Sequence, residues 1–129
     1  MVAEVGNNGP GLGTVNYPAK FSEVVAVAAT DENNAIAPFS SRGPEVDIAA
    51  PGTNIYSTSN NGDYATLSGT SMAVPHVTGA IALKLQLNPE LSPLQIMDEL
   101  KKTANYLPNA TPEEQGAGLV DAFKYCNCK

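Results

Sequence analysis

Residues 69–79 contain the side chain best suited to covalent chemistry, a serine where a turn becomes a helix. Ser71 has small neighbours and is followed by apolar residues at helical spacing, so we expect it at a helix N-terminus. Free backbone N–H groups and the positive end of the helix dipole favour negative charge there. This position suits a nucleophile, because an oxyanion formed beside it would be stabilised. The plainer interpretation is a serine that only caps the helix.

A serine nucleophile needs a general base, and His76 is the single histidine of the chain. It follows Ser71 by five residues on the same expected helix. At about 100° per residue, the two side chains are separated by roughly 140° around the helix axis. They therefore point to different faces, and we expect His76 to be structural. Lys84, the next cation along the helix, is too distant in sequence to suggest a Ser–Lys pair.

The elements that must position Ser71 alternate between strands and helices. Residues 24–29 are β-branched and apolar, as in a strand covered on both faces of a parallel sheet. Turn residues at 60–63 lie between two short strand patterns and predict a hairpin. The predicted strands are 2–5, 24–29, 46–49 (ended by Pro51), 54–58 and 64–67.

Two main helices are expected in the second half of the chain. The first covers 71–87, with apolar residues at three- and four-residue steps. Ser92, Pro93 and Gln95 have the pattern of an N-cap and capping box for the second. A short last helix is expected in the segment that follows Gly116. The alternation indicates an α/β fold with a parallel sheet, keeping about two sheet strands, a hairpin and two main helices.

Composition excludes several classes of protein. The 129 residues fit one domain or part of one, and a net charge of −6 argues against nucleic-acid and anionic-membrane surfaces. The longest apolar stretch, 24–29, is far too short to cross a membrane. Cys126 and Cys128 with one distant histidine do not make a zinc site, and we expect them to be exposed thiols near a frayed end.

The residues 69–79 read Gly-Thr-Ser-Met-Ala-Val-Pro-His-Val-Thr-Gly, which closely resembles the nucleophile signature of the subtilisin-like serine proteases, peptidase family S8. The Gly-Asn-Asn-Gly at 6–9 is similar to the Gly-Asn-x-Gly oxyanion segment of the family. Segments 17–20, 39–44 and 47–52 also resemble family segments, in the same order. The resemblance extends from Val2 to about Phe123.

The resemblance implies roles for individual residues. Ser71 matches the nucleophile, and Asn7 matches the asparagine whose amide donates to the oxyanion. Substrate-binding positions are matched by Glu4, Val5, Gly6, Gly69 and Thr70. Many relatives have a small residue at the position of Glu4. An acidic residue there either biases the pocket toward basic side chains or is an idiosyncrasy of this end of the chain.

The resemblance also implies a weak cation site, for Ca²⁺ or a monovalent cation, which the chemistry does not require. Its candidate ligands are the backbone carbonyls of Ala19, Phe21 and Val24, with the carboxylates of Glu45 and Asp47 nearby. Hard cations prefer such oxygen ligands. The Tyr17–Pro18 bond matches a cis-proline of the family.

Residues 1–129 are therefore expected to be the C-terminal part of a subtilisin-like catalytic domain with a partial three-layer fold. The family order places the catalytic Asp and His before the serine, so we expect both upstream of residue 2. The parent would be a serine endopeptidase acting on polypeptides, and this chain alone would be inactive. An exposed sheet edge and helix face would make it self-associate, rearrange or require the N-terminal half of the domain.

Two alternatives to that interpretation stay open. The chain is either a non-enzymatic interaction module on a protease scaffold, or an enzyme half that becomes active only with a complementing chain. Keeping Ser71 and Asn7 together with their glycine surroundings argues mildly against the interaction module.

Overall fold

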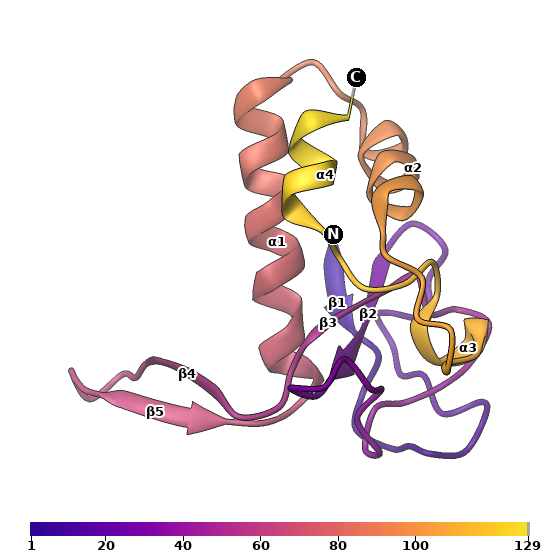
Figure 1. Ribbon diagram of the computed structural model, residues 1–129, viewed down its shortest axis with the longest axis vertical. Coiled ribbons are helices and arrows are strands. Elements are labelled where there is room, and N and C mark those ends of the chain that lie inside the picture. Colours follow the sequence, from indigo (N-terminus) through magenta and orange to yellow (C-terminus); the bar gives the residue numbers. More distant parts are fainter. Residues whose placement is uncertain (129) are drawn as a thin grey trace.

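The computed structural model describes residues 1–128 and has a three-stranded parallel sheet at its centre (Figure 1). Strands β1 (Val2–Glu4), β2 (Val25–Thr30) and β3 (Ile48–Pro51) lie in the order β1-β2-β3. All six residues of β2 are buried. A strand covered on both faces was predicted at 24–29, and the α/β class with a parallel sheet is confirmed.

The two faces of β2 pack into different clusters, as the two-residue period of a strand requires. Val25, Val27 and Ala29 face the helix α1 (Thr70–Leu87), with residues such as Val77. The alternate residues of β2 pack against Val24, Val15 and other residues of the long loops. The sheet is thus covered by a helix on one face and by loops on the other.

The sheet differs from the expectation in the number and bounds of its strands. Three strands are present rather than about two, and β3 begins two residues later than predicted and includes Pro51. Proline fits at this end of the strand because the next residue supplies the ladder bond, from the Gly52 N–H to the Thr30 carbonyl at 3.0 Å.

The predicted hairpin is confirmed. Strands β4 (Ile55–Thr58) and β5 (Tyr64–Leu67) pair antiparallel and project away from the rest of the structure (Figure 1). The exposed rings of Tyr56 and Tyr64 stack across the two strands with centroids 5.2 Å apart. Gly62, with φ of 83°, makes the turn that its sequence pattern indicated.

Three helices pack around one buried lysine. Helix α2 (Pro93–Thr103) begins with the predicted capping box at Ser92, and α4 (Ala122–Asn127) lies between α1 and α2 in Figure 1. Lys84 of α1 is 1% exposed; its Nζ lies 2.7 Å from Glu99 Oε2 and donates to the Cys128 carbonyl at 2.7 Å. It also lies over the buried ring of Tyr125, 5.5 Å from the centroid.

The second half of the chain differs from the sequence analysis at α3 and at the two cysteines. A short helix, α3 (Pro112–Gln115), was missed although Thr111 and Glu114 form a capping box there. Glu114 also pairs with Arg42. Cys126 and Cys128 are free but half-buried rather than fully exposed, because Tyr125 anchors α4 in the core.

Within the described residues, one outer edge of the sheet is covered by other segments and the other is uncovered. The edge of β3 is covered: the Ala49 N–H donates to the Gly118 carbonyl and the Val120 N–H to the Ala49 carbonyl, both at 2.9 Å. Within residues 1–128, no strand pairs with the outer edge of β1. Leu83 and Leu87 on α1 are also more than half exposed, as the uncovered helix face predicted from the sequence requires. No helix in the described part of the chain is long and apolar enough to span a membrane.

Candidate active site

The segment after β1 and the start of α1 meet, although more than sixty residues separate them in the chain. Helix α1 begins at Thr70, so Ser71 lies in its first turn, as predicted. The preceding Gly69 N–H donates to the Gly52 carbonyl at 2.8 Å, which ties the helix start to the residue after β3. Ser71 is exposed, whereas Thr70 beside it is fully buried.

The side chain of Asn7 is held in one orientation by Thr70. Asn7 Oδ1 accepts from the Thr70 N–H at 3.0 Å and from the Thr70 hydroxyl at 2.8 Å. The backbone donor can only face an acceptor, so the oxygen of the amide must be on this side. Asn7 Nδ2 is therefore turned the other way, and within residues 1–128 it donates to no protein acceptor.

Two N–H donors face the space in front of Gly69. A Cβ atom placed on Gly69 would lie 3.6 Å from Asn7 Nδ2 and 3.9 Å from the Ser71 backbone nitrogen. Gly69 has φ of 154°, and its missing side chain leaves this space open. Two N–H donors within 4 Å of one point next to the serine, with the thioether of Met72 as the third neighbour at 3.6 Å, are suited to hold a developing negative charge.

The loop between β1 and Asn7 is fixed by close packing. Val5 is fully buried, and its N–H donates to the Val27 carbonyl at 3.1 Å. Gly6 has φ of 103°, and a Cβ there would come within 2.5 Å of Asn16 Nδ2. The Gly6 carbonyl accepts from the Ser41 N–H at 2.9 Å. The chain can therefore turn toward α1 only with glycine at this position.

The last residue of β1 also reaches the serine. The Ser71 hydroxyl donates to the carboxylate of Glu4, whose side chain is half-buried. The structure thus brings Glu4, Asn7, Thr70 and Ser71 together at one place. The catalytic and binding roles that the resemblance gives to these residues, and to Val5, Gly6 and Gly69, stay predictions.

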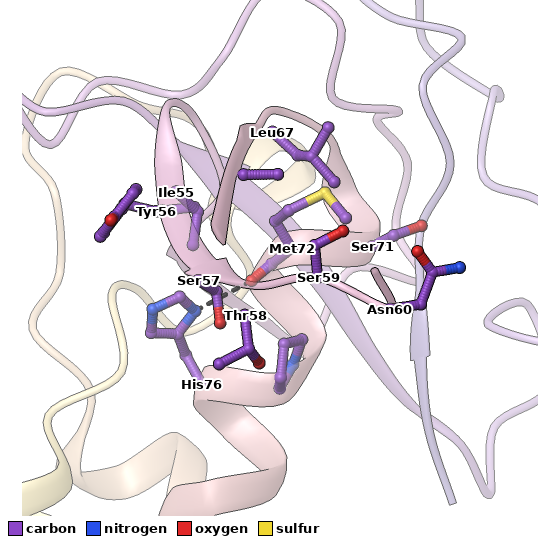
Figure 2. Close-up of a pocket in the computed structure, with 12 residues that line it drawn as sticks. Ile55, Tyr56, Ser57, Thr58, Ser59, Asn60, Leu67, Ser71, Met72 and His76 are labelled. Carbon is purple, nitrogen blue, oxygen red and sulfur yellow. Dashed lines mark hydrogen bonds between the residues drawn. The ribbon is translucent and has the colours of Figure 1, made fainter. Parts of the chain in front are cut away.

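His76 points away from the nucleophile, as its place on the helix predicted (Figure 2). Its Nδ1 lies 2.9 Å from the Met72 carbonyl, one turn back. His76 lines an open groove of about 670 Å³ between the hairpin and the first turns of α1. Met72, Pro75 and Ser71 line the same groove, so it includes the serine.

The candidate cation ligands lie on the loop side of the sheet. Ala19 and Val24 are buried there, and the Phe21 carbonyl accepts from the Val24 N–H at 3.1 Å. Both oxygens of Asp47 are engaged, one by the Ala26 N–H at 2.8 Å and the other by Lys101 Nζ at 2.5 Å. Glu45 Oε2 is buried with no hydrogen-bond partner among the described residues.

The residues present fit a cation at Glu45 better than at Asp47. A buried carboxylate oxygen without a donor is a natural ligand for a hard cation, whereas Asp47 is neutralised by Lys101. In residues 1–128 no three His, Cys, Asp or Glu side chains cluster closely enough to hold a metal by themselves. Any cation here would depend on backbone carbonyls as well.

The anchoring role of Thr70 is a feature that sequence reasoning missed. Thr70 was predicted to bind substrate, and in the structure its backbone and hydroxyl both bind Asn7. A threonine at an expected helix start, between a glycine and a serine, was the available signal. The cis bond at Tyr17–Pro18 was predicted from the resemblance and is confirmed.

Comparisons with known proteins agree with this arrangement. The subtilase family (Peptidase_S8) matches residues 1–118. Subtilisin Savinase of Lederbergia lenta is 48% identical over 122 residues, which are 95% of this chain and 44% of that protein. Minor extracellular protease Epr of Bacillus subtilis (strain 168) is 48% identical over 121 residues, or 93% of this chain and 19% of that protein.

A solved structure gives the same result for the fold. Sphericase superposes with a TM-score of 0.85 at 34% sequence identity, over 92% of this chain and 46% of that one. The chain thus spans less than half the length of these relatives.

Proposed function

The chain belongs to the subtilase family, and from that premise we propose that it carries the nucleophile of a serine endopeptidase. The substrate is a polypeptide, and the reaction is hydrolysis of a peptide bond through an acyl-enzyme on Ser71. The observation that carries the proposal is the meeting of Asn7 with the first turn of α1, where two free N–H donors flank the serine.

In the proposed reaction, Ser71 Oγ attacks the carbonyl carbon of the scissile bond while a base takes its proton. The carbonyl oxygen becomes negatively charged and accepts hydrogen bonds from Asn7 Nδ2 and the Ser71 N–H. The tetrahedral intermediate then expels the amine, which receives the proton, and leaves an ester on Ser71. Water hydrolyses that ester and frees the serine. The dipole of α1 favours the oxyanion at the same place.

The base of the proposed reaction comes from outside residues 1–129. His76 is directed at the Met72 carbonyl and not at Ser71, so it is unsuited to take the proton. The relatives are at least about twice as long as this chain, which leaves room for the Asp and His expected upstream. We therefore expect the isolated chain to be inactive, and the complete site to form when the N-terminal half of the domain is present.

The uncovered edge of β1 and the exposed leucines of α1 support a site that is completed by the N-terminal half of the domain. The outer edge of β1 lacks a partner strand within residues 1–128, and Leu83 and Leu87 are exposed on α1. Paired strands and a covered helix would remove both. The same flank supports the second candidate, an enzyme half activated by a complementing chain. Without either partner, the exposed edge favours self-association.

A weakly bound Ca²⁺ or monovalent cation is also proposed, with Glu45 as its carboxylate ligand. The buried, unpartnered oxygen of Glu45 supports it, and the resemblance adds the carbonyls of Ala19, Phe21 and Val24 as further ligands. When bound, the ion would neutralise the buried carboxylate and tie the loops on that side of the sheet. The chemical step at Ser71 does not require it.

A serine-directed fluorophosphonate probe tests the proposed function. The chain is treated with the probe alone and after refolding together with the N-terminal half of the domain, and labelled Ser71 is identified by mass spectrometry. We expect labelling only in the mixture, and none when Ser71→Ala replaces the chain. Labelling of the isolated chain would contradict the proposed inactivity, and no labelling of a correctly folded mixture would contradict the protease function.

An Asn7→Ala variant of the same mixture tests the oxyanion role. We expect peptidase turnover to fall by about 10²–10³-fold, the magnitude known for an oxyanion-hole asparagine in this family. The KM should change little, because the amide binds charge that develops only in the transition state. A variant with full turnover would show that Asn7 has no part in the reaction.

A further inference from the structure

We propose that Glu4 selects substrates with a positively charged side chain on the residue whose carbonyl Ser71 attacks. This assignment rests on the proposed protease function and adds a substrate class to it. The selection comes from the charge of one carboxylate that lies at the reacting centre.

Glu4 is held at this place by the sheet. It is the last residue of β1, and its pairing with Val27 fixes the position of its backbone. Its carboxylate reaches across to α1 and accepts a hydrogen bond from the Ser71 hydroxyl. A carbonyl under attack must come within about 3–3.5 Å of that hydroxyl. The side chain next to the attacked carbonyl is therefore within reach of Glu4.

The charge of Glu4 has no partner in the described chain. The ion pairs among residues 1–128 join Arg42 to Glu114, and Lys84, Lys101 and Lys124 to other carboxylates, and none includes Glu4. Glu4 is half-buried as a residue and its contact with Ser71 is exposed, so water screens the carboxylate in part. A cation brought by the substrate would be its first close partner.

The reaction itself makes this charge selective. Negative charge develops on the substrate oxygen beside Ser71, and the hydroxyl of Ser71 also contacts the Glu4 carboxylate. Two like charges this close raise the barrier for a neutral substrate. A lysine or arginine side chain beside Glu4 would cancel that repulsion and gain a charge-assisted hydrogen bond. Repulsion and attraction thus favour the same substrates.

A carboxylate that accepts from a serine hydroxyl is also the geometry of a general base. The two roles predict different outcomes. Loss of a base would slow the reaction of every substrate, whereas loss of a selecting charge would slow cationic substrates and accelerate neutral ones. Glu4→Gln separates them, because it keeps the size of the side chain and an oxygen that can accept from Ser71.

The test compares two diphenyl phosphonate probes on the protein that carries this chain together with its N-terminal half. One probe has a lysine side chain and the other has norleucine, which differs mainly in the terminal ammonium group. In both reactions Ser71 Oγ forms a bond to phosphorus, one P–O bond to a phenoxy group breaks, and phenol leaves with the serine proton. The rate of labelling of Ser71 is followed by mass spectrometry.

We expect the lysine probe to react about 10- to 100-fold faster than the norleucine probe, which is the usual effect of one charge-assisted pair. In Glu4→Gln the ratio should fall to about unity, with the norleucine probe reacting faster than in the wild type. Glu4→Asp should keep a preference for lysine. Glu90→Gln, at an exposed carboxylate in the turn after α1, removes the same charge and should leave both rates unchanged.

Three results would overturn the assignment. The first is a Glu4→Gln variant that keeps the full preference, and the second is a wild type without preference. The third is a Glu4→Gln variant that loses labelling by both probes, which would make Glu4 a base. If the neutral fluorophosphonate also fails to label Ser71 in the wild type, the proposed protease function itself is contradicted, and the assignment falls with it.

Discussion

The two flanks of the central sheet differ in how completely they are built. On the β3 side, Gly118 and Val120 cover the strand edge, and α2 and α4 enclose the buried Lys84. On the β1 side, the strand edge has no partner in the described chain, and α1 exposes leucines. The candidate site lies on the β1 side, where the strand edge is uncovered. The comparison teaches that the stabilising core and the reactive residues of this chain are spatially separate. Stability and reactivity can therefore be disrupted by different substitutions.

The largest expected effect is a loss of stability on the β3 side of the sheet, at the buried Lys84. In Lys84→Ala, the carboxylate of Glu99 loses its cation and the Cys128 carbonyl loses its donor. We expect the free energy of unfolding to fall by about 3–4 kcal/mol, measured by urea denaturation. Lys102→Ala, at an exposed lysine of α2, should change stability by less than about 0.5 kcal/mol. A similar loss in both variants would show that the cluster contributes nothing specific.

A smaller effect is expected from Tyr125 in alkaline solution. Burial, followed by the charges of Glu99 and Cys126, raises the pKa of Tyr125 to about 12 from its usual 10. The unfolded chain therefore loses this proton at lower pH than the folded one, so stability falls as pH rises from 10 to 12. We expect a loss of up to about 2 kcal/mol over this range.

Tyr125→Phe is the control for that pH dependence. It removes the ionising group and the hydrogen bond to the Ile96 carbonyl at 3.2 Å, so stability should be lower at neutral pH. Its fall between pH 10 and 12 should be shallower than in the wild type, measured by urea denaturation at each pH. Equal slopes would place the alkaline sensitivity in other groups.

The smallest expected effect is a loss of activity on the β1 side of the sheet, at the candidate site. Thr70→Ala removes one of the two donors that hold the Asn7 amide and leaves the backbone donor in place. We expect kcat of the complete protease to fall about fivefold, the equivalent of one hydrogen bond, with KM unchanged. Thr70→Ser should restore kcat, because it retains the hydroxyl. A rise in KM without a change in kcat would instead make Thr70 a substrate contact.

The sequence predicted the features that depend on local pattern. The apolar run of β2, the hairpin turn at Gly62 and the capping box at Ser92 are properties of short segments, and all are present. The helical spacing of the apolar residues after Ser71 was enough to place this serine in the first turn of α1. The angular argument for His76 also depended only on one helix, and it gave the correct direction.

Features that depend on distant partners could not be predicted in this way. A lysine on an apolar helix is expected to reach solvent, and only Glu99, Tyr125 and the Cys128 carbonyl make Lys84 a buried residue. The hydrogen bonds from Thr70 to Asn7 likewise join residues 63 positions apart. All three sheet strands were predicted as strands, but their number in one sheet was undercounted because the pairings join residues more than twenty positions apart.

The closure of the β3 edge has a consequence for the order of events during synthesis. Ala49 pairs with Leu119, which follows it by 70 positions in the chain. At about 5–20 residues per second, this edge stays uncovered on the nascent chain for about 4–14 s after Ala49 has been made. A strand edge exposed for that long is a target for aggregation and for chaperones. The segment around Leu119 therefore covers the edge of β3 only several seconds after that strand has been made.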